Sequence, residues 1–97
     1  MSHDMNDLLA QLERRTAGGL ALLPDDLQVT LQGTPDEFRQ ALGAVLFDIH
    51  AGADNSDYAR GIDFGRALGI ISAGAALNLI SHAHQDALMA ALSKVKP

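Results

Sequence analysis

The residue types of a hydrolase triad occur near the end of the chain, in Ser72, Ser81, His84 and Asp86. A triad is defined by geometry, with the nucleophile held against a base and the base held against an acid. Neither serine lies in the Gly-x-Ser-x-Gly turn that exposes a nucleophile in many hydrolases. We therefore expect no catalytic residue among these four and predict that the protein is not an enzyme.

His82 and His84 form a His-x-His pair that could ligate a metal if His50 and Asp86 completed the set. On a strand, residues two apart point the same way, but on a helix they diverge by about 160°. Both histidines fall where a helix is expected to begin. The pattern favours an exposed helix start, with no metal and no cofactor, and small-ligand or metal binding is kept as a second alternative function.

Gly61, Gly65 and Gly69 recur at every fourth residue, and Ala73 continues the row. This spacing suits one face of a helix, not a phosphate-binding turn. Each glycine inside a helix costs up to about 1 kcal/mol, so another helix is expected to approach this face closely. That helix could belong to the same chain or to a second copy. Asp63 and Arg66 disfavour a pair of membrane helices.

The composition is that of a globular, acidic protein. Ninety-seven residues make one domain, with 47% hydrophobic residues, 20% charged residues and a net charge of −5. Nucleic acid is not favoured as a partner because phosphate binding needs a basic surface. Cysteine is absent, and residues 1–15 lack the features of a signal peptide. We expect a cytoplasmic protein that does not enter a membrane.

Two helices are predicted in the first half of the chain. Residues 4–17 form an amphipathic helix with Met5, Leu8, Leu9, Leu12 and Thr16 on one side, and Gly18 and Gly19 are expected to end it. Residues 35–50 form the second helix. Thr34, Pro35 and Glu37 predict a capping box at its start, with Thr34 as the N-cap.

Two further helices are predicted over residues 57–77 and 82–95. Ser56 or Asn55 is expected to cap the first, and Ser81 the second. Asn78 is predicted to adopt the left-handed conformation that ends the first of these helices. The corner from Leu77 to Ser81 resembles the helix–corner–helix endings of many small bacterial and phage-encoded proteins, although Asn78 departs from their usual glycine.

Residues 20–33 are ambiguous. Leu27, Val29 and Leu31 alternate with polar residues, which is typical of a strand, and residues 20–23 could be its hairpin partner. The alternative is an extended linker with one helical turn at Pro24. The chain as a whole predicts an all-α domain of four helices, and whether a short hairpin or single strand lies between the first two is left open.

The apolar residues exceed what four short helices can cover. Phe47 lies opposite the core stripe of its helix and is a candidate for a second buried surface. We predict a homodimer with Phe47 or the row of Gly61, Gly65, Gly69 and Ala73 in its interface. The predicted function is a non-enzymatic protein–protein interaction module, such as a regulator, adaptor or inhibitor. A helix-turn-helix transcriptional regulator is the first alternative, but its would-be reading helix contains no arginine.

Overall fold

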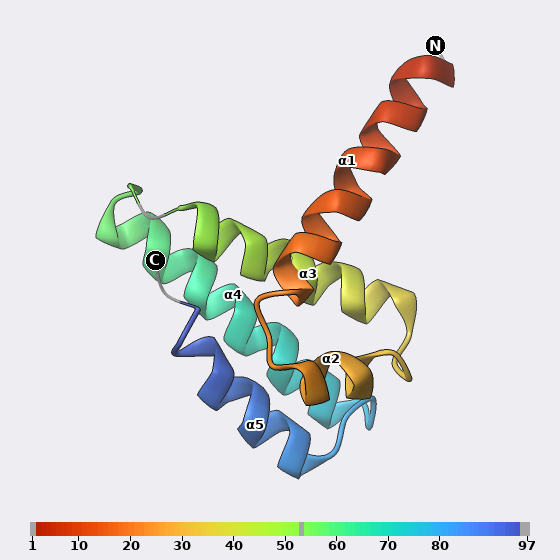
Figure 1. Cartoon of the computed structure of the whole chain (residues 1–97). Helices are drawn as coiled ribbons and strands as arrows, with labels where there is room; N and C mark the ends of the chain where they lie inside the picture. The colour runs from red at the N-terminus through yellow and green to blue at the C-terminus, as the bar shows by residue number, and fades with distance from the viewer. Residues whose placement is uncertain (1, 53, 96–97) are drawn as a thin grey trace.

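The computed structural model describes residues 2–52 and 54–95. In this part of the chain there are five α-helices and no strand (Figure 1). They are α1 (Ser2–Leu20), α2 (Asp25–Leu31), α3 (Asp36–Ala51), α4 (Asp57–Ala76) and α5 (His82–Leu92). The prediction of a helical domain is confirmed, but the predicted number of four helices is wrong. None of the helices in these ranges has both the length and the apolar character needed to cross a bilayer.

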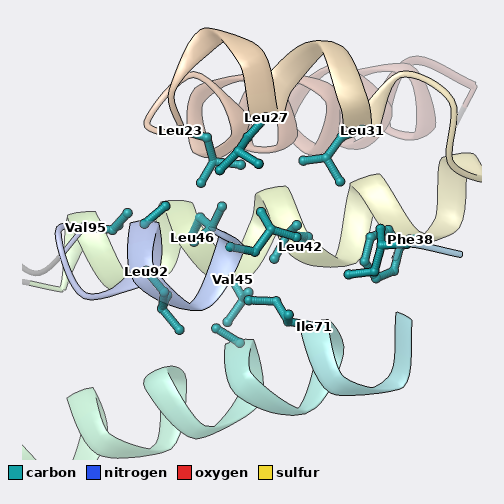
Figure 2. Packing of buried hydrophobic residues seen from close by; sticks show 14 of the residues in the cluster. Leu23, Leu27, Leu31, Phe38, Leu42, Val45, Leu46, Ile71, Leu92 and Val95 are labelled. Carbon is teal, nitrogen blue, oxygen red and sulfur yellow. The ribbon is translucent and has the colours of Figure 1, made fainter. Parts of the chain in front are cut away.

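Helices α2 to α5 surround one aliphatic core, which Figure 2 shows from close by. Leu42, Val45 and Leu46 of α3 lie at its centre and are almost completely buried. Complete burial of a leucine or valine side chain contributes roughly 1.5–3 kcal/mol to the stability of the fold. These residues therefore hold together helices α2 to α5, which we call the body. The other helices and the segment before α2 supply the remaining buried side chains, among them Leu23, Leu27, Leu31, Ile71, Leu88, Leu92 and Val95.

Of the two alternatives for residues 20–33, the hairpin is wrong, and the helical turn at Pro24 is closer, because the segment contains the short helix α2 directly after Pro24. Leu23, Leu27 and Leu31 are buried, whereas Val29 is exposed. The buried leucines are four residues apart, which is a helical repeat. The strand interpretation relied on the alternation of Leu27, Val29 and Leu31, which would place all three in the core. Val29 instead faces solvent, so the alternation does not describe the buried side of this segment.

The predicted capping box at the start of α3 is also wrong. The helix begins at Asp36, and the residue before it, Pro35, makes no side-chain capping bond. Thr34 is buried, and its hydroxyl donates to the carbonyl oxygen of Leu31 at 2.6 Å. Arg39 then reaches back and donates to the carbonyl oxygen of Gln32 at 3.1 Å. Thr34 and Arg39 therefore satisfy carbonyl groups at the end of α2, which a helix terminus leaves without partners.

The predicted caps of the last two helices are confirmed. The Ser56 hydroxyl accepts from the Ala59 amide at 3.2 Å, and the Ser81 hydroxyl accepts from the His84 amide at 3.1 Å. Asn78 has a φ of 60°, as predicted for the end of α4. The Leu79 amide donates to Gly74 and the Asn78 amide to Ala75, so the corner is a Schellman motif.

Helix α1 does not end at Gly18 and Gly19, contrary to the prediction, but continues to Leu20. Both glycines lie where α1 crosses α3. A Cβ atom added to Gly19 would overlap the carbonyl of Gly43, and one added to Gly43 would lie 2.9 Å from the Thr16 Cα atom. The two helix backbones are therefore in direct contact. This close crossing holds α1 on the body, while its first half projects away from it (Figure 1).

Candidate interaction surfaces

The projecting half of α1 exposes large apolar side chains. Met5, Leu8 and Leu9 are 58%, 60% and 51% exposed. Their spacing places them on one side of the helix, and we call these three residues the α1 face. A contiguous set of exposed apolar side chains commonly marks an interaction site.

The α1 face continues a side of the helix that is already in contact with α3. Thr16 and Gly19 lie on this same side at the crossing with Gly43, and the half-buried Leu12 lies between the two regions. Helix α1 packs mainly on α3. Within the described residues, the apolar stripe of α1 is therefore covered by α3 at one end and exposed at Met5, Leu8 and Leu9 at the other.

The glycine row lies on an exposed side of α4. A Cβ atom added to Gly61, Gly65 or Gly69 would meet nothing within 4 Å. Of the two alternatives for the glycine row, close packing against a helix of the same chain is therefore wrong. Helix α4 uses the opposite side for the core, through Ala67, Ile71, Gly74 and Ala75. The propensity cost of a glycine is the same on either side of a helix, so the spacing alone could not identify the buried side.

Other apolar residues share the exposed side of α4. Tyr58 is 80% exposed, Ile62 is 47% exposed and Leu77 is 68% exposed. We call this surface the α4 face, and it comprises Tyr58, Gly61, Ile62, Gly65, Gly69, Ala73 and Leu77. None of these seven residues is charged, and Arg66, which is 54% exposed, lies on the same side of the helix. The participation of Gly61, Gly65, Gly69 and Ala73 in contacts between chains stays a prediction.

Phe47 is half-buried, and α1 is the helix that lies over it. A Cβ atom added to Gly18 would lie 3.3 Å from the Phe47 ring. The second surface of α3 that the sequence indicated is thus occupied, at least in part, by the first helix of the same chain. An interface role for Phe47 between two chains stays a prediction.

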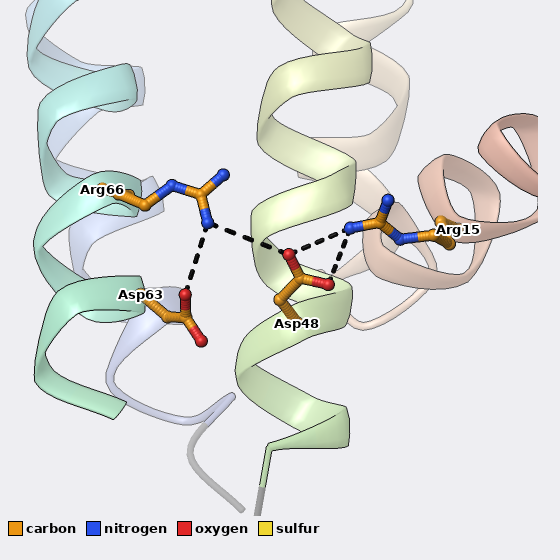
Figure 3. A network of polar contacts seen from close by, with 4 residues as sticks. All are labelled: Arg15, Asp48, Asp63 and Arg66. Carbon is orange, nitrogen blue, oxygen red and sulfur yellow. Dashed lines mark hydrogen bonds and ion pairs between the residues drawn. The ribbon is translucent and has the colours of Figure 1, made fainter. Parts of the chain in front are cut away.

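A polar network connects the three longest helices (Figure 3). Arg15 of α1 donates to both carboxylate oxygens of Asp48 on α3, at 2.7 and 3.0 Å. Arg66 of α4 lies 3.9 Å from Asp48 and 3.3 Å from Asp63. Two guanidinium groups therefore share one carboxylate. Asp48 is only 29% exposed, so this cluster is better shielded from solvent than the other ion pairs of the described residues.

The side chains considered for catalysis or metal binding have structural partners or stand apart. The Nδ1 atom of His84 lies 2.9 Å from the Ser81 hydroxyl, which also caps α5. In a triad the serine faces Nε2 and the acid faces Nδ1, so this pair has the wrong arrangement. His82 instead faces Gln85, at 3.3 Å. Among residues 2–52 and 54–95, no three histidine or carboxylate side chains gather as a metal site.

A shallow groove lies beside His84, between the end of α2 and the corner from Asn78 to Ser81. Its lining includes Thr30, Thr34, Leu79 and His84 and contains no carboxylate, lysine or arginine side chain. Such a lining offers little to orient a charged ligand, and the groove is weaker as a binding site than either apolar face.

Comparison with models of known families, with curated proteins and with solved structures finds no significant match.

The sequence indicated Gly61, Gly65, Gly69 and Ala73 as one face of a helix but did not indicate Tyr58 or Ile62 beside them, and it did not indicate the α1 face as a surface. The amphipathic spacing of Met5, Leu8 and Leu9 predicted a helix correctly. The signal that could have found the surface is the pair of glycines at the end of this helix. At Gly19 the glycine marks close approach of another backbone, which fixes where α1 contacts the rest of the protein, whereas Gly61, Gly65 and Gly69 have open space beside them.

Proposed function

We propose that this protein is a non-enzymatic protein–protein interaction module that acts as a homodimer, in the manner of a small regulator, adaptor or inhibitor. The observation that supports this proposal is the α1 face. Met5, Leu8 and Leu9 are more than half exposed on a helix that projects from the body. Burial of such side chains between two chains removes apolar area from water at about 25 cal/mol per Å².

The polar side chains support the non-enzymatic part of this proposal because they have structural roles. The Ser81, Thr34 and Arg39 side chains bond to helix ends, and Arg15 and Asp48 connect helices. These hydrogen bonds and ion pairs stabilise the fold.

A pair of chains joined through the α1 face leaves the α4 face available for a different protein. A regulator or adaptor needs such a second surface.

Light scattering across a range of micromolar concentrations tests this proposal. The chain has a mass of 10.2 kDa, and we expect a mass near twice that value. Leu8→Glu should return the protein to the monomer because it places a charge in the apolar contact. Val29→Glu is the matched control, since Val29 is an exposed apolar residue on α2, outside both faces. A monomer mass for the unaltered protein at every concentration would refute the homodimer.

A further inference from the structure

We infer that the occupant of the α1 face is the α1 helix of a second copy, lying antiparallel across a two-fold axis near Leu8 and Leu9. This inference rests on the proposed homodimer and adds the contact, its direction and its register. Three observations support it. Within the described residues, the projecting half of α1 lacks packing from its own chain, the acidic and basic residues of α1 lie at different ends, and α3 limits the length over which a second helix can pack.

The projecting half of α1 requires packing that its own chain does not provide. Isolated helices shorter than about 12–15 residues are marginal in water, and most helical stability in proteins comes from packing of the apolar side. Helix α1 packs mainly on α3, and its first turns project away from the other helices (Figure 1). A second copy of the same stripe supplies the missing contact.

The charges of α1 favour the antiparallel direction. Asp4 and Asp7 lie near the start of the helix, and Arg14 and Arg15 near the end of the projecting part. A parallel pair would bring the two acidic ends level with each other, and likewise the two ends that carry Arg14 and Arg15. An antiparallel pair places the acidic end of each helix against the basic end of the other, and it also opposes the two helix dipoles.

The positions of the charges around the helix support the same arrangement. Asp4 and Arg15 are eleven residues apart, which is close to three full turns, so they flank the α1 face on the same side. Arg15 is 42% exposed and uses only one of its terminal nitrogens for Asp48. Its remaining donors are available to Asp4 of the second copy.

The register follows from the apolar stripe. Centring the pair between Leu8 and Leu9 brings Met5 of one copy against Leu12 of the other. The crossing at Thr16 and Gly19 then sets the limit of the contact, because α3 covers the stripe beyond that point. The start of the second α1 helix therefore stops beside the body of the first copy.

Cysteine cross-linking tests this arrangement, because the natural chain contains no cysteine. A disulfide needs Cα atoms about 4.4–6.8 Å apart. Leu9→Cys should link to its own copy under mild oxidation. Met5→Cys alone should not, because the two residues would lie roughly 10 Å apart along the pair. A mixture of Met5→Cys and Leu12→Cys should link. Arg14→Cys, on the opposite side of α1, is the control and should not link.

A charge reversal gives an independent measurement. Asp4→Lys should raise the concentration at which the dimer dissociates several-fold, since it places a cation beside Arg15 of the second copy. Asp7→Lys makes the same change on the far side of α1 and should shift dissociation less. Both variants keep the α1 face and change net charge equally, so their difference reports the position of the charge.

The outcomes separate this inference from the proposed function. Linking of Met5→Cys to itself would establish a parallel pair and overturn the inference. A dimer mass without linking at Leu9→Cys would place the interface elsewhere, which also overturns the inference while the homodimer stands. A monomer mass at every concentration would refute both. Linking at Leu9 and in the Met5 and Leu12 mixture, without linking at Arg14, supports the antiparallel pair.

Discussion

The glycines of this chain have two different roles. The role depends on whether another helix backbone packs against the glycine or the glycine faces open space. Gly19 and Gly43 lie at the crossing of α1 and α3, where no side chain fits between the backbones. Gly61, Gly65 and Gly69 lie in a helix of the same chain with open space beside them. The first pair fixes the position of α1, whereas the second set creates a flat exposed surface.

This difference predicts opposite effects for one substitution. Gly19→Ala should lower the free energy of unfolding by about 2 kcal/mol, because the added methyl overlaps the Gly43 carbonyl and forces the helices apart. Gly65→Ala should raise it by up to about 1 kcal/mol, because alanine has the higher helix propensity. Urea denaturation of both variants measures these changes. Equal effects of the two substitutions would contradict the close crossing.

Thr34 supports a second prediction at the residue scale. Thr34→Val keeps the size of the buried side chain and removes its hydrogen bond to the Leu31 carbonyl. Thr34→Val should lower the free energy of unfolding by about 1 kcal/mol. The decrease is no larger because the Leu31 carbonyl also accepts from the Thr34 amide at 3.0 Å and keeps that partner. Chemical denaturation measures the loss, and Thr30→Val, whose hydroxyl bonds at an exposed position, is the control. A loss no greater than that of the control would show that the buried bond contributes nothing.

At the scale of elements, local signals predicted α4 and α5 because their caps and turns act within a few residues, whereas the predicted cap of α3 was wrong. Ser56, Ser81 and Asn78 have their predicted roles. The type of α2 was not predictable in this way. Leu27 and Leu31 fit a strand and a helix equally well, and the choice depends on a distant core that includes Leu42 and Leu46.

The interaction surfaces were predictable only in part, for a similar reason. The sequence indicated that the row of Gly61, Gly65 and Gly69 lies on one helix face, and this is what the structure has. Which face is buried depends on how α4 is turned against α3, and no local pattern specifies that rotation. Likewise, the apolar spacing of Met5 and Leu8 specifies a helix but not the length over which the body covers it.

The corner between α4 and α5 gives a prediction for an element boundary. Asn78→Gly should raise the free energy of unfolding by up to about 1 kcal/mol, because glycine adopts a positive φ without steric cost. Asn78→Ala should lower it by about the same amount. Thermal denaturation of the two variants gives the comparison. If the alanine variant were as stable as the glycine variant, the left-handed conformation would not be required at this corner.

At the scale of the whole molecule, Asp48 connects α1, α3 and α4. Asp48→Asn should lower the free energy of unfolding by up to about 1 kcal/mol, because Arg15 loses its charged partner and Arg66 keeps only Asp63, while both arginines are partly exposed. The difference from the unaltered protein should shrink at high salt, which screens the pairs. Asp57→Asn removes an almost fully exposed carboxylate paired with Arg60 and should have a smaller effect. Denaturation at low and high salt measures both, and an Asp48 effect independent of salt would argue against an electrostatic connection.

The projection of α1 has a consequence for how strongly a target is held. If two copies join through their projecting helices, the two bodies lie at opposite ends of the pair, and each carries an α4 face. The assembly is then bivalent. A target with two matching sites at the right separation would be bound with an avidity greater than that of one face, by a factor of up to about 10²–10⁴. Because Gly19 and Gly43 hold each α1 helix at a fixed crossing, the spacing of the two faces would be set by helix geometry, and only targets with that spacing would gain.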